Sequence, residues 1–152
     1  PAMFANPTHS NLVNLVNDPI ERVDGRNDFL WLIGMEHTPF PGEAPQARAC
    51  GGCWLEPGDL RVMSGATYTG YSQRERAYML TADANAESCR FELLPVEGVP
   101  VRNPAFIVNG WGGDAEVTVA GALRVKSGRE GDTLVIFVEG TFAGPTAVSI
   151  AR

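Results

Sequence analysis

The sequence of 152 residues is 44% hydrophobic and 20% charged, so a disordered chain is excluded and one domain with a sizeable core is expected. Its formal net charge of −6 at pH 7 argues against nucleic acid as the main partner, because phosphate contacts need clustered cations. No apolar run approaches the roughly 20 residues that a membrane span needs, and 17 Gly and 11 Pro favour a turn-rich β protein.

The first third of the chain is expected to be mostly irregular. Pro1-Ala2-Met3 is interpreted as a remnant of cleavage and cloning, so residues 4–152 are expected to form a single domain. The first residues lack the basic and apolar regions of a signal peptide. Leu12, Val13, Leu15 and Val16 fit either a short helix or an edge strand. Phe29-Leu30-Trp31-Leu32-Ile33 is apolar at every position, which predicts a strand with both faces covered.

The segment from Thr38 to Pro57 is predicted to be a long loop, and it contains Cys50-Gly51-Gly52-Cys53. A Cys-x-x-Cys turn lets both thiolates face one metal ion. Together with Cys89 and His37, these cysteines would complete a Cys3His set for a structural Zn²⁺. The alternatives are a disulfide between Cys89 and one loop cysteine, as in secreted proteins, or simple buried or free thiols.

Strands are predicted at Leu60–Met63 and Ala77–Thr81, joined by a glycine-spaced connection that carries Tyr68 and Tyr71. This region also supplies side chains that polysaccharide lyases and glycosidases use. Tyr or His can move a proton, Arg can neutralise a uronate, and paired carboxylates can hydrolyse a glycosidic bond. The candidates here are Tyr68, Tyr71, Arg74, Glu75 and Arg76, with His37 possible in the same set. The alternative is a solvated turn whose tyrosine rings cap the edge of the core.

The rest of the chain predicts short strands separated by Gly, Pro, Asn or Asp. The predicted strands are Ser88–Leu94, a run within Asn103–Trp111, Glu116–Ala120, a hairpin of Leu123–Val125 with Thr133–Val138, and Ala147–Ile150. The hairpin is expected to reverse over residues 127–132. About nine short strands indicate an all-β fold, an antiparallel β-sandwich of jelly-roll or immunoglobulin-like type.

The aromatic residues are the candidates for stacking on a sugar face, because a flat ring offers large apolar area at small entropic cost. Trp31 lies in an apolar run and is interpreted as core, which leaves Trp54, Trp111, Tyr68 and Tyr71 as possible binding residues. The alternative for Trp111 is that it plugs one end of the sandwich. A structural Ca²⁺ is a further possibility, since oxygen ligands are available from Asp114, Glu116, Glu130 and Asp132.

Three segments carry a resemblance to a known family: Tyr71–Leu80, Asn103–Trp111 and Gly131–Val138. They resemble a C-terminal β-sandwich accessory domain of bacterial polysaccharide-degrading enzymes and related secreted proteins. The resemblance implies a non-catalytic module that binds a glycan or packs on a catalytic domain. It also implies a parent protein that is secreted or periplasmic. Its partner would be a polysaccharide or the parent catalytic domain, with no nucleic acid and no membrane.

The sequence therefore predicts a non-catalytic accessory module that binds a glycan or packs on a catalytic domain. One alternative is a small lyase or glycosidase that uses Tyr71 or His37 with Arg74, and another is a structural protein-interaction domain. The candidate ligand-binding residues are Trp54, Tyr68, Tyr71, Arg74 and Trp111. The candidate metal ligands are Cys50, Cys53, Cys89 and His37, for Zn²⁺, with Ca²⁺ as the other possible ion.

Overall fold

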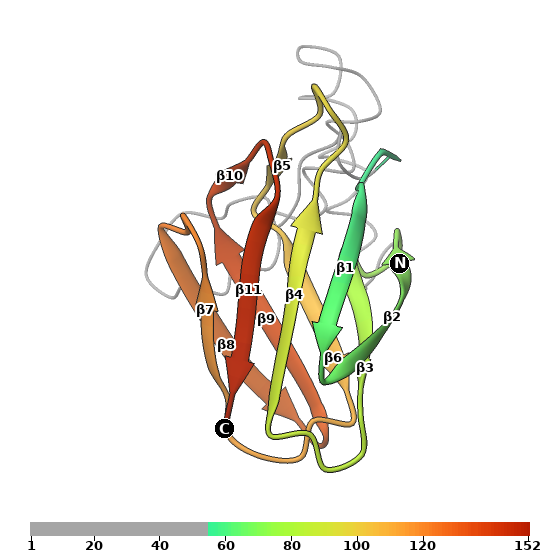
Figure 1. The fold of residues 1–152 in the computed structure, drawn as a ribbon, viewed down its shortest axis with the longest axis vertical. Helices are drawn as coiled ribbons and strands as arrows, with labels where there is room; N and C mark the ends of the chain where they lie inside the picture. The colour runs from blue at the N-terminus through green and yellow to red at the C-terminus, as the bar shows by residue number, and fades with distance from the viewer. Residues whose placement is uncertain (1–54) are drawn as a thin grey trace, which may run out of the picture.

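A computed structural model describes residues 55–152, and these residues form eleven β-strands (Figure 1). The strands are β1 (Asp59–Ser64), β2 (Ala66–Ser72), β3 (Ala77–Ala82), β4 (Ser88–Leu94), β5 (Val101–Arg102), β6 (Ala105–Asn109), β7 (Glu116–Val119), β8 (Arg124–Glu130), β9 (Thr133–Glu139), β10 (Thr141–Phe142) and β11 (Thr146–Ala151). The features predicted before residue 55 lie outside the described residues. Among residues 55–152, no helix has the length and apolarity to cross a membrane.

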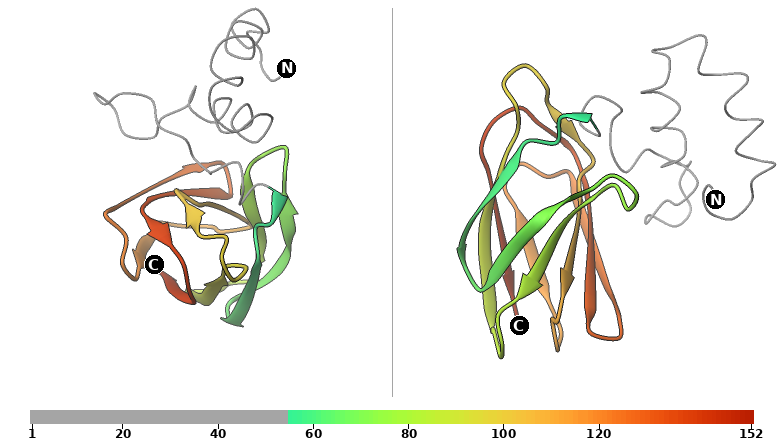
Figure 2. Two further views of the ribbon diagram at one scale, coloured as in Figure 1. Left: turned by 90° about the horizontal axis from the view of Figure 1, so that it is seen from above. Right: turned by 90° about the vertical axis from the view of Figure 1, so that its right-hand side faces the viewer.

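The strands make a β-sandwich of two main sheets, which Figure 2 shows as two layers. One sheet has four strands in the order β1-β4-β11-β7, and the other has five in the order β2-β3-β6-β9-β8. A short two-stranded pair, β10-β5, lies at one end (Figure 1). The predicted all-β sandwich is confirmed. One pairing departs from the antiparallel pattern, since β3 and β6 run parallel to each other.

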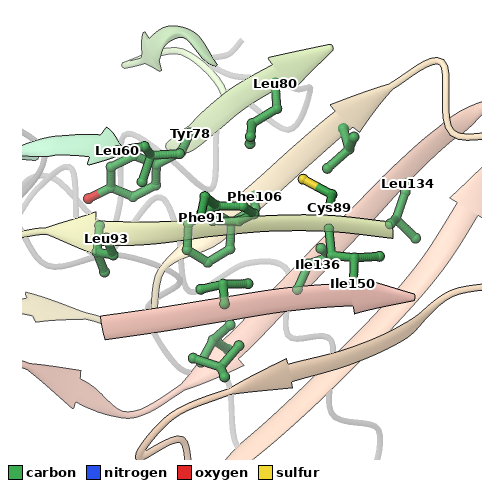
Figure 3. Close-up of a cluster of buried hydrophobic side chains, with 14 of the residues drawn as sticks. Leu60, Tyr78, Leu80, Cys89, Phe91, Leu93, Phe106, Leu134, Ile136 and Ile150 are labelled. Atoms are coloured by element: carbon green, nitrogen blue, oxygen red, sulfur yellow. The ribbon is translucent and has the colours of Figure 1, made fainter. Parts of the chain in front are cut away.

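The core lies between the sheets and follows from the alternation of apolar side chains along each strand. In β4, Cys89, Phe91 and Leu93 are buried while the residues between them face outward. Phe106 of β6 stacks on Tyr78 at 5.3 Å between ring centroids and meets Phe91 of the opposite sheet edge-on at 5.2 Å (Figure 3). These aromatic contacts join the two sheets at the centre of the core.

The structure corrects two predictions about connections. The segment predicted to connect two strands, Ser64–Tyr71, is mostly strand β2, and the chain changes sheets at Gly65, whose φ is +88°. Glycine adopts this left-handed conformation without a steric penalty, so one residue is enough for the change of sheet. The hairpin reversal is also shorter than expected. β8 continues to Glu130, and only Gly131 and Asp132 separate it from β9.

Candidate functional site

The predicted metal site cannot be assembled from the described residues. Cys50, Cys53, His37 and the binding candidate Trp54 lie outside residues 55–152. Cys89 is a buried free thiol between the sheets, near Phe106, Leu134 and Ile150 (Figure 3). Burial, and secondarily the charge of Asp83, raises the pKa of Cys89 to about 11. A Zn²⁺ at Cys89 would need its other ligands to enter the core. The zinc set stays a prediction.

The predicted calcium ligands do not gather in the described part of the chain. Within residues 55–152, no group of three His, Cys, Asp or Glu side chains is placed to hold a metal ion. Asp114, Glu116, Glu130 and Asp132 are all exposed and lie on different loops and strand ends. These residues therefore do not form the predicted Ca²⁺ site.

The tyrosines belong to the core side of the five-stranded sheet. Tyr71 packs edge-on against Tyr78 with 4.8 Å between ring centroids, and its hydroxyl is buried. Tyr68 packs against the same core, while Arg74 is exposed in the turn between β2 and β3. The lyase hypothesis needs Tyr71 and Arg74 on one surface that a substrate can reach. The buried hydroxyl of Tyr71 does not meet this requirement.

The tyrosines make stability depend on pH at the alkaline end. Burial, and secondarily the charge of Asp59, raises the pKa of Tyr68 from 10.0 to about 12. Burial also raises the pKa of Tyr78, whose hydroxyl donates a hydrogen bond of 2.7 Å to the carbonyl of Pro57. Folding thus favours the protonated phenols. The stability that they contribute is fully present below pH 10 and is lost as the pH rises through the folded pKa values.

We therefore expect the near-ultraviolet phenolate absorbance of the folded chain to rise at higher pH than that of the urea-unfolded chain. Urea denaturation at a series of pH values should show stability falling from about pH 10 toward pH 12. Coincident titration curves for folded and unfolded chain would contradict the buried position of these rings. Tyr68→Phe should remove part of the pH dependence and leave stability at pH 7 nearly unchanged.

Trp111 is part of the core and not of an exposed binding surface. Its ring has 0% exposure, and its Nε1 donates a hydrogen bond of 3.0 Å to the carbonyl of Asp114. The guanidinium of Arg152 lies over the ring at 5.2 Å from its centroid. Arg152 also donates to the carbonyls of Ala86 and Gly112, at 2.9 and 2.7 Å. The ring closes one end of the sandwich, as in the alternative interpretation of Trp111, and it presents no exposed face to a ligand.

The outer faces of the two sheets differ in chemistry. On the four-stranded sheet most outward residues are polar or small, including Arg61 and Glu92, which form an ion pair, and Ala147 and Ser149. On the five-stranded sheet β6 and β9 carry apolar side chains on both faces. Strands of that kind are typical of sheets with both faces covered. The outer face of the five-stranded sheet is therefore the candidate functional surface.

Strand register arranges this outer face in three rows. We name them the alanine row (Ala77, Ala105, Phe137, Lys126), the central row (Met79, Ile107, Val135, Gly128) and the threonine row (Thr81, Asn109, Thr133, Glu130). In the threonine row, the hydroxyl of Thr133 donates a hydrogen bond of 3.2 Å to Oδ1 of Asn109. An apolar row thus lies beside a row of hydroxyl, amide and carboxylate groups, a combination that suits ligand binding.

A groove of about 620 Å³ follows these rows. Its lining consists of Glu75, Met79, Ile107, Asn109, Lys126, Ser127, Gly128, Arg129, Glu130, Thr133, Val135 and Phe137. The aliphatic side chains of the central row form its floor, and polar and charged groups from β8, the turn before β3 and the threonine row form its rim. Two residues singled out from the sequence, Glu75 and Glu130, are among the lining residues. Among residues 55–152, the aromatic and arginine candidates Tyr68, Tyr71, Arg74 and Trp111 are not, so the sequence indicated the rim of this groove only in part.

Gly128 supports a binding role for this groove. It lies inside β8, its φ is not in the left-handed region, and a Cβ added there would meet no atom within 4 Å. Neither the backbone conformation nor the packing of residues 55–152 requires glycine at this position. Glycine inside a strand often marks a place where a ligand or another backbone comes close. The missing side chain keeps the groove open over Val135, its partner on β9.

Comparison with known proteins identifies no relative that could assign this groove. No family model, no curated protein and no solved structure matches the chain. The interpretation of the groove therefore rests on its own residues and geometry.

Proposed function

We propose that this protein is a non-catalytic accessory module of a secreted polysaccharide-active protein, and that it binds a glycan chain in the groove of the five-stranded sheet. The observation that carries the proposal is an aliphatic floor, Met79, Ile107 and Val135, bordered by Asn109 and Thr133. A sugar ring presents an apolar face and a rim of hydroxyl groups. The floor can pack on the apolar face while amide and hydroxyl groups take the hydroxyls.

The spacing of the carboxylates in the groove favours binding over cleavage. Glu75 precedes β3, whereas Glu130 ends β8, three strands away, on the row of Thr81. Three strand spacings give about 14 Å and the four residues from Ala77 to Thr81 give about 13 Å, so the strand positions nearest the two carboxylates are roughly 19 Å apart. Hydrolysis by a carboxylate pair needs a separation of about 5–9.5 Å. Among residues 55–152, the lining of the groove also includes no His, Tyr or Cys.

The charges in the groove support a neutral glycan as the ligand. Lys126 and Arg129 offer two positive charges, and Glu75 and Glu130 offer two negative charges. A uronate polymer would be attracted to the cations and repelled by the carboxylates. A neutral chain can form hydrogen bonds with all four groups, while their two positive and two negative charges balance each other.

Gly128→Trp tests this function, because the new ring would fill the groove from a strand position without backbone strain. We expect the full chain to be retarded in affinity electrophoresis by at least one neutral polysaccharide, and Gly128→Trp to weaken that binding roughly tenfold or more. Gly112→Trp is the matched control, since Gly112 is exposed, also has an unstrained φ and open space for a Cβ, and does not line the groove.

Retention of binding in Gly128→Trp, or retardation by no polysaccharide, would contradict glycan binding at this groove. Binding to a separately produced catalytic domain of the parent protein, lost in Gly128→Trp and kept in Gly112→Trp, would instead assign the groove to packing on that domain. Retardation by uronate polymers alone would contradict the neutral ligand.

A further inference from the structure

Strand β8 lies at one edge of the five-stranded sheet and differs from the other edge strands of the two main sheets. In β1 the register shifts between Val62 and Ser64, in β2 it shifts between Tyr68 and Gly70, and β7 has only four residues. Bulges and short strands keep a sheet edge from pairing with another chain. Strand β8 pairs with β9 over seven residues without a shift. Among residues 55–152, it is therefore the one main-sheet edge that lacks both of these devices.

The strand register shows which backbone groups of β8 point to the free edge. The amide of Val138 in β9 donates a hydrogen bond of 3.0 Å to the carbonyl of Pro104, on the side of β9 that faces β6. Backbone groups of successive residues point to opposite sides of a strand, so the neighbours of Val138 bond to β8, at its even-numbered residues. The N–H and C=O groups of Val125, Ser127 and Arg129 are thus directed at the free edge.

The outward side chains of β8 are complementary in charge to their own reversed order. Lys126, Gly128 and Glu130 are the β8 members of the three rows, and all three are exposed. Within residues 55–152, neither Lys126 nor Glu130 takes part in an ion pair. They cannot pair with each other, because four residues of strand place them about 13 Å apart. An antiparallel copy of β8 that is centred on Gly128 would present the opposite charge to each of them.

We propose that two copies of this chain pair through β8, antiparallel and centred on Gly128, so that Lys126 of each copy lies opposite Glu130 of the other. Ser127 of each copy then lies opposite Arg129 of the other, and the backbone groups of both residues point into the new ladder. The two glycines meet at the centre, where the absence of a side chain lets the backbones come close. This two-fold arrangement closes on itself and gives a dimer, not a fibre.

Charge selects this register over its neighbours. Centring the pair on Ser127 would place Glu130 opposite Arg124, whose Nε already donates to Glu139 of its own chain. Centring it on Lys126 would place two lysines opposite each other, and like charges in that position are destabilising. A lysine alone on an edge strand discourages pairing. Here Glu130, four residues further along the strand, makes the same lysine favour one pairing.

The dimer would join the two five-stranded sheets into one continuous sheet. Lys126, Gly128 and Glu130 also line the groove, so the grooves of the two copies would lie side by side across the two-fold axis. A single strand edge is a small interface beside the roughly 800 Å² per partner of a stable dimer, so we expect a dissociation constant in the micromolar range. The inference does not rest on glycan binding, because the pairing uses only the backbone and the charges of β8.

Sedimentation equilibrium of the full chain without polysaccharide tests the dimer. Lys126→Glu should raise its dissociation constant roughly tenfold or more, since two attractive pairs become repulsive. Adding Glu130→Lys to the same chain should restore the dimer, because the exchanged charges are again opposite. Arg90→Glu is the matched control, since it makes the same change in net charge at an exposed residue of β4, and it should leave the dissociation constant unchanged.

Cross-linking gives a second test, since Lys126 is the only lysine of the chain. A carbodiimide should join Lys126 to Glu130 between labelled and unlabelled chains in a 1:1 mixture. A chain that stays monomeric throughout the micromolar range would overturn the proposal, and so would cross-links of Lys126 confined to its own chain. A dimer that Lys126→Glu leaves unchanged, or that the charge exchange does not restore, would overturn it as well.

Discussion

Trp111→Ala should lower the free energy of unfolding of the full chain by about 3–5 kcal/mol, the range for deleting a large buried aromatic ring. The ring is completely buried, and its loss would leave a cavity beside the carbonyl of Asp114 and the guanidinium of Arg152. A domain of this size has about 5–15 kcal/mol of stability in total, so the loss would be a large share. Urea denaturation followed by far-ultraviolet circular dichroism measures it.

Two further variants separate the contributions at this end of the sandwich. Trp111→Phe keeps most of the packing but leaves the Asp114 carbonyl without its donor, for an expected cost of about 1–3 kcal/mol. Arg152→Ala removes the cation over the ring and its hydrogen bonds to Ala86 and Gly112, and exposed groups of this kind should contribute about 1 kcal/mol. A loss below 1 kcal/mol for Trp111→Ala would contradict the buried position and restore the ring as a binding candidate.

Gly65→Ala is the second substitution for which we expect a large loss of stability. An added Cβ would lie 2.0 Å from the carbonyl oxygen of Ser88, which is backbone and cannot rotate away. The φ of +88° adds backbone strain for any L-residue. Strain of about 1–3 kcal/mol and overpacking of about 1–3 kcal/mol together give an expected loss of about 2–6 kcal/mol.

Gly128→Ala is the matched control for Gly65→Ala. Its Cβ would meet nothing and its φ is unstrained, so alanine should stabilise β8 by about 0.5–1 kcal/mol. Both variants are measured by urea denaturation of the full chain. If Gly65→Ala and Gly128→Ala changed the free energy of unfolding by the same amount within about 0.5 kcal/mol, the change of sheet at Gly65 would be contradicted. A stabilising Gly128→Ala would show that folding does not require this glycine, as expected for a position reserved for a ligand.

Much of the fold could be predicted from the sequence, because side chains along a strand alternate between the buried and the exposed face with a period of two residues. The bounds predicted for β4 match those observed, and β1, β3, β9 and β11 were placed within two residues. Strand β2 was missed because Thr69 and Gly70 interrupt the alternation at a bulge, where the pairing with β3 slips between Tyr68 and Gly70. The parallel pairing of β3 with β6 has no local signal, since it joins residues far apart in sequence.

The groove could have been anticipated more fully than it was. The runs Phe106-Ile107-Val108 and Leu134–Val138 are apolar at consecutive positions, the same pattern that predicted a covered strand at residues 29–33. Applied to β6 and β9, it indicates that the outer face of their sheet is not plain solvent-facing surface. The position of Gly128 on that face could not be predicted, because it depends on the register between β8 and β9.

The place of β11 in its sheet has a consequence for how the protein is made. This strand is the last of the eleven in sequence, yet it lies between β4 and β7 and pairs with both. Until the ribosome releases residues 146–151, β4 lacks one neighbour and β7 has none in its sheet. Nascent chains would therefore emerge with unpaired strand edges, and the sandwich would close only after translation of this region, in the slow range typical of folds dominated by distant pairings.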